Sequence, residues 1–181
     1  MVKVKFRLTR EEYLDFNYYT AWSSPDRKKY RFRYYTKVFL LYSGVAVVYI
    51  LTKQSANFVI DFSVFGGIGM VYFLLVPYLI KRSVKRRVNE ILGSNENKHI
   101  LEESEVIVDT GGITDRDEVS ESRYDWEAVV RKAETTDCYY LYTNSHHAIV
   151  LPKRALLVQQ RQQLNDLFTE HLSLSAEFSD H

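Results

Sequence analysis

Five side chains around one predicted β-hairpin carry groups that could do chemistry: Glu134, Asp137, Cys138, His146 and His147. A cysteine with a histidine is the pattern of a nucleophile and its base, and the intervening turn could bring Cys138 and His146 across the hairpin. Two histidines with a carboxylate are the ligand types of a metal site, but adjacent histidines in a turn point in different directions. Because Cys138 lies among aromatic strand residues, we expect a buried, inert thiol and neither a metal nor another cofactor.

The compact motifs of several enzyme classes are missing from the sequence. It contains no phosphate-binding loop, no glycine-rich dinucleotide turn and no zinc-protease motif. Gly111 and Gly112 are explained by a tight turn between strands, and Cys138 is the single cysteine, so it has no disulfide partner within the chain. We therefore predict that the protein is not an enzyme.

The elements that position these groups include two apolar stretches, Val38–Leu51 and Phe58–Ile80. A bilayer core of roughly 30 Å needs about 20 apolar helical residues, and Phe58–Ile80 meets that length alone. The first stretch meets it when its flanks are added, giving Tyr34–Thr52. We expect two transmembrane helices that form a hairpin, and the alternative is one span followed or preceded by a re-entrant or interfacial helix.

Basic residues flank this hairpin on its outer sides. Eleven Lys or Arg stand there, against Lys53 alone in the connecting loop Lys53–Asn57. Because positive charge is enriched in cytoplasmic segments, the pattern predicts a multi-pass protein of the cell membrane with both termini in the cytoplasm. The basic flanks would contact anionic lipids of the inner leaflet. These flanking residues are Arg27, Lys28, Lys29, Arg31, Arg33, Lys37, Lys81, Arg82, Lys85, Arg86 and Arg87.

Small and polar residues mark the second apolar stretch. Ser63, Gly66 and Gly67 predict close packing of the hairpin on itself, and homo-oligomerisation through Gly66–Gly69 is the alternative. Asp61 is the one carboxylate within a span, and carboxylates at membrane depth are often functional. It lies near the external end of the stretch, where water can reach it, so we interpret it as structural rather than as part of an ion pathway.

Charge is segregated along the chain. Residues 1–87 contain 16 basic and 5 acidic side chains, whereas residues 88–181 contain 8 and 18. An acidic domain is repelled both by an anionic membrane surface and by nucleic acid. We therefore expect no nucleic-acid partner, and we expect the second half to bind neither acidic lipids nor phosphate backbones.

The polar parts of the chain predict an α+β fold. The N-terminus alternates as a half-buried strand, and Thr9 to Glu12 has the form of a capping box that begins a helix. The expected division is 1–24 for this strand and helix, 25–93 for the hairpin, and 94–181 for an antiparallel β domain closed by a helix. We expect Trp126 to fill the core of the β domain, and the closing helix to carry Leu157, Leu164 and Phe168 on one side. Further expected elements are strands over Ile100–Leu101, Glu105–Asp109, Glu118–Tyr124, Tyr139–Thr143 and Ala148–Leu151, and a helix over Lys153–Leu172.

Several short patterns in the second half resemble those of the YcxB-like family of small bacterial membrane proteins. They are Glu102-x-Ser104, Gly111-Gly112-Ile113, Trp126-x-x-Val129, Glu134-Thr135, Tyr139-Tyr140-Leu141-Tyr142 and Leu151-Pro152-Lys153-Arg154-Ala155-Leu156. The resemblance implies a two-helix transmembrane hairpin inserted between an N-terminal strand and helix and a C-terminal PH-like β domain with a closing helix. It implies no reaction.

These observations favour an interaction or regulatory module at the inner leaflet that binds a cytoplasmic protein partner. Lys153 and Arg154 are the candidate binding residues of the β domain, and a solvated helix start is the alternative explanation for both. A second hypothesis is a membrane immunity or envelope-stress protection protein that acts through its hairpin.

Overall fold

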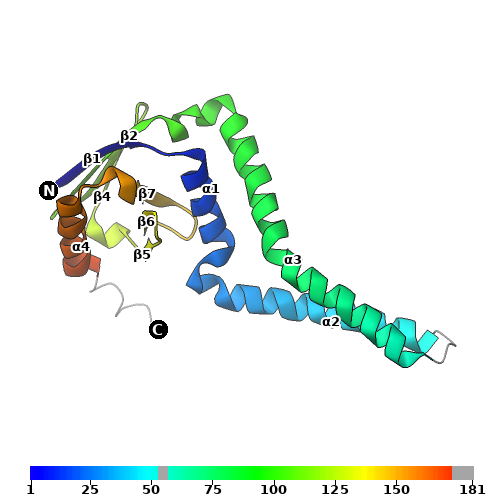
Figure 1. Cartoon of the computed structure of the whole chain (residues 1–181). Coiled ribbons are helices and arrows are strands. Elements are labelled where there is room, and N and C mark those ends of the chain that lie inside the picture. Colours follow the sequence, from blue (N-terminus) through cyan, green and yellow to red (C-terminus); the bar gives the residue numbers. More distant parts are fainter. Residues whose placement is uncertain (53–56, 173–181) are drawn as a thin grey trace. The chain divides into compact units, whose positions relative to one another are not determined.

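The chain folds into two units in the computed structural model, which describes residues 1–52 and 57–172. One unit, here called the β unit, joins Met1–Asn17 to Arg87–His181, and the other, the hairpin unit, is Tyr18–Arg86. The N-terminal strand therefore belongs to the same unit as the C-terminal strands (Figure 1). The predicted external loop falls on residues 53–56, which lie outside the described residues, and on Asn57.

The first sheet of the β unit is antiparallel and has the order β1-β2-β3-β4. Its strands are β1 (Val2–Arg7), β2 (Glu103–Asp109), β3 (Gly112–Arg116) and β4 (Glu121–Tyr124). Val4 of β1 pairs with Val106 of β2, although the whole hairpin unit separates them in sequence. The predicted alternation of β1 is confirmed, because Val2, Val4 and Phe6 are buried and the residues between them are exposed.

The second sheet is also antiparallel and has the order β5-β6-β7. Its strands are β5 (Arg131–Glu134), β6 (Cys138–Tyr142) and β7 (Ala148–Pro152). Every residue of the central strand β6 is buried, which explains its continuous aromatic and aliphatic sequence. Leu164 and Phe168 of helix α4 (Val158–Leu172) join the core that the two sheets enclose. The predicted α+β class is confirmed.

Trp126 lies in the short helix η4 (Trp126–Ala128) and fills this core. Its ring is stacked on His171, with 4.9 Å between ring centroids, and meets Phe168 edge-on at 6.2 Å. The indole Nε1–H donates a hydrogen bond to the carbonyl oxygen of Asp109 at 3.0 Å. The expectation that Trp126 is a core residue is confirmed.

Two predicted elements were wrong. Ile100 and Leu101 lie in the 3-10 helix η3 (Asn95–Leu101) rather than in a strand, because a two-residue apolar run does not distinguish strand from helix. The closing helix begins at Val158 rather than at Lys153, after the short helix η5 (Lys153–Ala155). Leu157, expected on the buried side of that helix, is exposed.

Helix α1 (Arg10–Tyr18) begins with the predicted capping box. The Glu12 N–H donates to Oγ1 of Thr9 at 3.1 Å, and the Thr9 N–H donates to Oε2 of Glu12 at 2.8 Å. These two bonds satisfy amide groups that a helix leaves without partners at its N-terminus. They fix the point at which the chain leaves β1 and turns into the helix.

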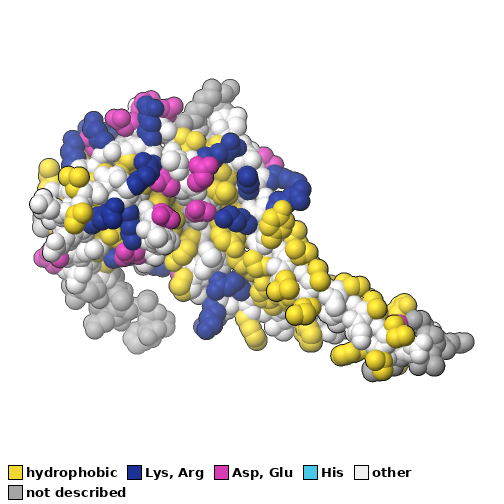
Figure 2. Space-filling view, in the orientation of Figure 1, with side chains coloured by type: hydrophobic (Ala, Val, Ile, Leu, Met, Phe, Trp, Pro, Cys, Tyr) yellow, Lys and Arg dark blue, Asp and Glu magenta, His cyan; other side chains and the backbone are white. Residues whose placement is uncertain are grey.

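The hairpin unit contains two short helices, η1 (Tyr19–Ser23) and η2 (Pro25–Arg27), one long helix, and a second long helix up to Arg86. The long helices are α2 (Lys28–Thr52) and α3 (Phe58–Gly93), and the predicted end of α3 at Gly93 is confirmed. Two helices of the described chain are long and apolar enough to cross a membrane. Yellow hydrophobic side chains run along the surface of this helical pair in Figure 2.

Aromatic side chains hold α2 and α3 together. The Tyr42 ring of α2 lies 6.0 Å from the Phe65 ring of α3, and its hydroxyl donates to the Phe65 carbonyl oxygen at 2.8 Å. Tyr49 also meets Phe65, with 5.3 Å between centroids, and Tyr35 meets Phe73 at 5.4 Å. Contacts between aromatic rings of α2 and aromatic rings of α3 therefore hold the hairpin together.

The predicted packing of the hairpin through Ser63, Gly66 and Gly67 was wrong. A Cβ added at Gly66 or Gly67 meets no other described atom within 4 Å, and Ser63 is exposed, with its hydroxyl donating to the Val59 carbonyl at 2.8 Å. The glycine at the interface is Gly69, where an added Cβ would lie 3.2 Å from Cε1 of Tyr42. Glycine spacing along one helix does not show which side the partner helix covers.

Replacing Gly69 with leucine should therefore destabilise the hairpin, whereas Gly67→Leu should leave it unchanged. A leucine at position 69 must displace the Tyr42 ring, and such overpacking costs about 1–3 kcal/mol. Denaturation of each full-length variant in mixed detergent micelles measures the difference. An equal loss in the Gly67 variant would contradict this packing.

Candidate functional site

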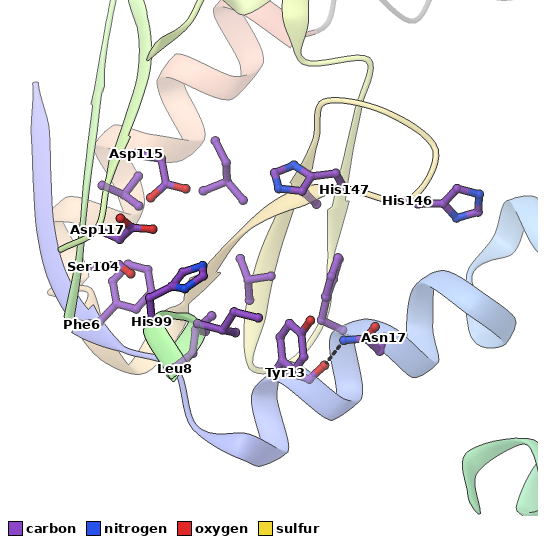
Figure 3. Close-up of a pocket in the computed structure, with 16 residues that line it drawn as sticks. Phe6, Leu8, Tyr13, Asn17, His99, Ser104, Asp115, Asp117, His146 and His147 are labelled. Atoms are coloured by element: carbon purple, nitrogen blue, oxygen red, sulfur yellow. Dashed lines mark hydrogen bonds between the residues drawn. The ribbon is translucent and has the colours of Figure 1, made fainter. Parts of the chain in front are cut away.

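The β unit contains a cavity of about 370 Å³. It lies between the two sheets, with β2 and β3 on one side, β7 on the other, and α1 and η3 beside them (Figure 3). Its described lining residues are Phe6, Leu8, Tyr13, Phe16, Asn17, His99, Ile100, Ser104, Val106, Asp115, Asp117, His146, His147, Ala148, Ile149 and Val150. All of them belong to the β unit, so the cavity is formed within one unit.

One part of the cavity wall is apolar. Phe6 and Val106 come from neighbouring strands of the first sheet, and Ile149 comes from β7 of the second. Phe16 of α1 is buried, and the centre of its ring lies 5.4 Å from that of Tyr140. Tyr13, one turn earlier in α1, also lines the cavity. Phe6, Val106 and Ile149 also belong to the hydrophobic core, so the apolar part of the wall is continuous with the core.

The other part of the wall is polar and carries Asp115, Asp117, His99 and His147 (Figure 3). Asp117 is held by its own loop, since its Oδ1 accepts the Val119 N–H at 2.8 Å and the Ser120 hydroxyl at 3.1 Å. The side chain of Asp115 forms no hydrogen bond or ion pair within the part of the chain that the structure describes. It is thus a carboxylate that faces the cavity and has no protein donor.

The two aspartates differ in acidity. Burial, followed by the neighbouring charge of Asp117, raises the pKa of Asp115 above its usual value, and the His147 imidazole opposes this only in part. Burial would also raise the pKa of Asp117, but the backbone N–H groups of its loop, the Ser120 hydroxyl and the charge of His99 together lower it. The site therefore holds one fixed negative charge and one carboxylate that is costly to ionise.

The raised pKa of Asp115 predicts that Asp115→Asn stabilises the β unit at neutral pH. A folded state with the higher pKa binds more protons than the unfolded state, so stability falls as pH rises from the unfolded pKa, about 3.9, through the folded value. The isosteric amide removes this cost and should raise the free energy of unfolding near neutral pH by ~0.5–2 kcal/mol. Urea unfolding at several pH values tests this, and the gain should shrink as the pH approaches about 4. A gain that is the same at every pH would contradict it.

The turn after β6 places the two histidines differently. The side-chain Oδ1 of Asn144 accepts the N–H groups of His146 at 2.9 Å and His147 at 2.8 Å, and Nδ1 of His147 lies 3.1 Å from the Thr143 hydroxyl. Figure 3 shows His147 on the side of Asp115 and His146 pointing away. The turn is therefore built from its own polar groups, and it directs one imidazole into the cavity.

The strand register keeps Cys138 away from these histidines, so the nucleophile and base pair considered from the sequence is not formed. Cys138 pairs with Pro152 at one end of the β6–β7 hairpin, whereas Tyr142 and Ala148 pair at the other end, next to the histidine turn. Across the described residues, no three His, Cys, Asp or Glu side chains are placed to hold a metal ion. The hairpin register, which loop length alone does not fix, separates the groups.

Cys138 is buried at the start of β6. Burial, followed by the negative charges of Glu12 and Asp137, raises the pKa of its thiol to about 12. Since the thiolate is the nucleophilic form, a thiol of this kind is unreactive near neutral pH. The interpretation of Cys138 as an inert core residue agrees with this environment.

Lys153 and Arg154 are both engaged in ion pairs of the β unit. The Lys153 Nζ lies 2.7 Å from Oε1 of Glu134, and its charge lies 4.9 Å from the centre of the Tyr139 ring. Arg154 binds both oxygens of Glu12, at 2.7 and 2.9 Å, and also donates to the Arg7 carbonyl. The two cations therefore connect η5 and α1 to the sheets, which gives each of them a structural role.

Asp61 lies in the first turn of α3. The N-terminal end of a helix carries partial positive charge and stabilises a nearby carboxylate. This position gives a structural reason for the single acidic residue within the apolar stretch, in agreement with its interpretation as structural.

The cavity was not predicted from the sequence, although one signal was present. Ile113, Asp115 and Asp117 follow one another at a spacing of two, so a strand that buries Ile113 also turns Asp115 inward. Ile113 is fully buried, and Asp115 indeed shares its face. An acidic residue on the inward face of a strand is the pattern that could have located the site.

The chain is therefore an α+β protein with a cavity in its β unit, and a pair of long apolar helices interrupts this unit in sequence. Residues 108–168, which run from β2 to α4, match the model of the YcxB-like protein family, so the expected resemblance is confirmed over this segment. No curated protein and no solved structure matches the chain.

Proposed function

We propose that this protein is an integral membrane protein that presents the β unit as an interaction or regulatory module at the inner leaflet of the cell membrane. The helices α2 and α3 would cross the bilayer as a hairpin, with both termini in the cytoplasm. The observation that carries the proposal is the exposed apolar surface of the hairpin unit, which requires a partner that water does not provide.

That surface is formed by large aliphatic side chains on both helices. Leu51 is 79% exposed, Val59 is 75% exposed and Leu74 is 72% exposed. In their most apolar windows, none of the residues of the first helix and only 11% of those of the second are buried. Soluble proteins seldom leave contiguous apolar patches of this kind, whereas lipid tails would cover them at no cost.

The charges beside the hairpin support the proposed orientation. Lys28, Lys29 and Lys37 near the start of α2 are exposed, as are Lys81, Arg82 and Lys85 in the last part of α3. Each such cation near an anionic leaflet contributes about 1 kcal/mol to membrane attachment. Both ends of the hairpin would therefore lie at the cytoplasmic surface, where anionic lipids contact them.

The order of the strands supports a PH-like fold for the β unit. A four-stranded and a three-stranded antiparallel sheet enclose one core, and a C-terminal helix packs against it. Fold alone does not determine a ligand. The cations Lys153 and Arg154 are occupied by carboxylates, which favours a cytoplasmic protein partner over an anionic lipid headgroup and gives no support to nucleic acid.

Two measurements on the full-length chain test this proposal. Alkaline carbonate extraction separates integral from peripheral proteins, and we expect the chain to stay in the membrane pellet. Co-purification from native membranes should then yield a partner that is lost with Gly112→Ala, which disrupts the β unit, and kept with Gly111→Ala. A partner kept by both variants would favour the alternative, protection of the membrane through the hairpin, and release by carbonate would contradict the proposal itself. Recovery of the chain itself as the partner would show a homo-oligomer and would contradict a cytoplasmic adaptor role.

A further inference from the structure

We propose that the cavity of the β unit binds a small organic cation with an apolar body, whose charged nitrogen lies against Asp115. This inference goes beyond the proposed function and does not depend on it, because the cavity belongs to the β unit alone. It would make the β unit a receptor for a small molecule in addition to a surface for a protein.

The size and the shape of the cavity fit a small molecule. Its volume of about 370 Å³ is at the lower end of the range of roughly 300–1,000 Å³ that is usual for ligand sites. Ligand sites typically combine an apolar lining with a few polar groups that fix the orientation of the ligand. Here Phe6, Phe16 and Ile149 supply the apolar part, and the polar groups gather on the other part of the wall.

The charge of the lining selects a cation. Among the described lining residues there are two aspartates and no lysine or arginine. The Asp117 carboxylate already receives hydrogen bonds from its own loop, whereas the Asp115 carboxylate receives none from the described residues. A bound ammonium group would give Asp115 the donor and the counter-charge that the protein does not provide, and charge-assisted bonds of this kind are among the strongest in proteins.

Other occupants fit this lining less well. An anion would meet two carboxylates, and a metal ion would need three or more ligands that the described residues do not bring together. A neutral apolar molecule would give the Asp115 carboxylate neither a donor nor a counter-charge, so burial and the charge of Asp117, which raise its pKa, would stay uncompensated. The imidazoles of His99 and His147 lie on the same polar part of the wall as the two aspartates.

The test uses phenethylamine as the cationic probe and 3-phenylpropionate as an anion of similar size and apolar body. Full-length protein in nanodiscs of zwitterionic lipid is titrated with each probe at about pH 8, where aspartates are ionised and the amine is protonated, and binding is measured by isothermal calorimetry. Empty nanodiscs correct for partitioning of the probes into lipid. We expect saturable binding of phenethylamine and none of 3-phenylpropionate.

Three variants locate the binding. Asp115→Asn keeps the shape of the side chain and should weaken phenethylamine binding about tenfold or more, whereas Asp166→Asn, which removes an exposed carboxylate of α4, should not change it. Ala148→Phe places a ring in the cavity and should abolish binding. Equal affinity for both probes, an unchanged affinity in Asp115→Asn, or the absence of saturable binding would each overturn the proposal.

Discussion

Gly112→Ala will destabilise the β unit by about 3 kcal/mol or more, and Gly111→Ala, one residue earlier, will have little effect. Gly112 has a φ angle of +137°, a backbone conformation that side-chain-bearing residues rarely adopt. A Cβ there would also overlap the carbonyl oxygen of Tyr124 and lie 3.2 Å from Cα of Asp125. Both obstacles are backbone atoms of β4 and its end, so relief requires β3 and β4 to separate.

Gly111 provides the matched control for this experiment. A Cβ at Gly111 would lie 3.2 Å from Nη2 of Arg123 and from Oδ1 of Asp109, which are side-chain atoms. The arginine can move away at small cost, and the backbone of Gly111 is not in the positive-φ region. Thermal unfolding of the full-length variants, followed by near-ultraviolet circular dichroism, compares the two. Equal midpoints for the two variants would show that the turn is not constrained as described.

Trp126→Ala will cost about 3–5 kcal/mol of the stability of the β unit, the range for removal of a buried aromatic side chain. The change leaves a cavity among Phe168, His171 and the strands, and it removes the donor to the Asp109 carbonyl. That carbonyl belongs to the last residue of β2, directly before the Thr110–Gly111 turn that leads into β3. The substitution therefore weakens the core and the end of a central strand together.

Val130→Ala is the control for the tryptophan variant. Val130 lies shortly after η4, the short helix that contains Trp126, and is 62% exposed. Its truncation should therefore change the free energy of unfolding by no more than about 0.5 kcal/mol. Urea unfolding followed by near-ultraviolet circular dichroism gives both values. A loss of less than about 1 kcal/mol in Trp126→Ala would contradict the burial described for this residue.

Local signals in the sequence predicted the elements that depend on neighbouring residues. The alternation of β1, the capping box of Thr9 and Glu12, and the end of α3 at Gly93 follow from backbone geometry and from groups within a few positions. Trp126 was predicted as a core residue of the β domain, and it is buried. These features need no knowledge of the tertiary structure.

Features that depend on distant partners were predicted less well. The interface of α2 and α3 is set by which rings meet, so Gly69 rather than Gly66 or Gly67 faces Tyr42. The β6–β7 register separates Cys138 from His146, although the loop between them is short. The cavity joins residues of β1, α1, β3 and β7, and only their assembly shows that Asp115 faces it.

The orientation of the hairpin is the central claim, and labelling of single cysteines in sealed, right-side-out membrane vesicles tests it most directly. Native Cys138 is buried and should not react with a membrane-impermeant maleimide in the folded protein. Two variants introduce a second cysteine: Asn57→Cys at the residue before α3, and Gln163→Cys at an exposed position of α4. We expect Asn57→Cys to react in intact vesicles and Gln163→Cys to react only after permeabilisation. Reaction of both from the same side would contradict a two-span hairpin with a cytoplasmic β unit.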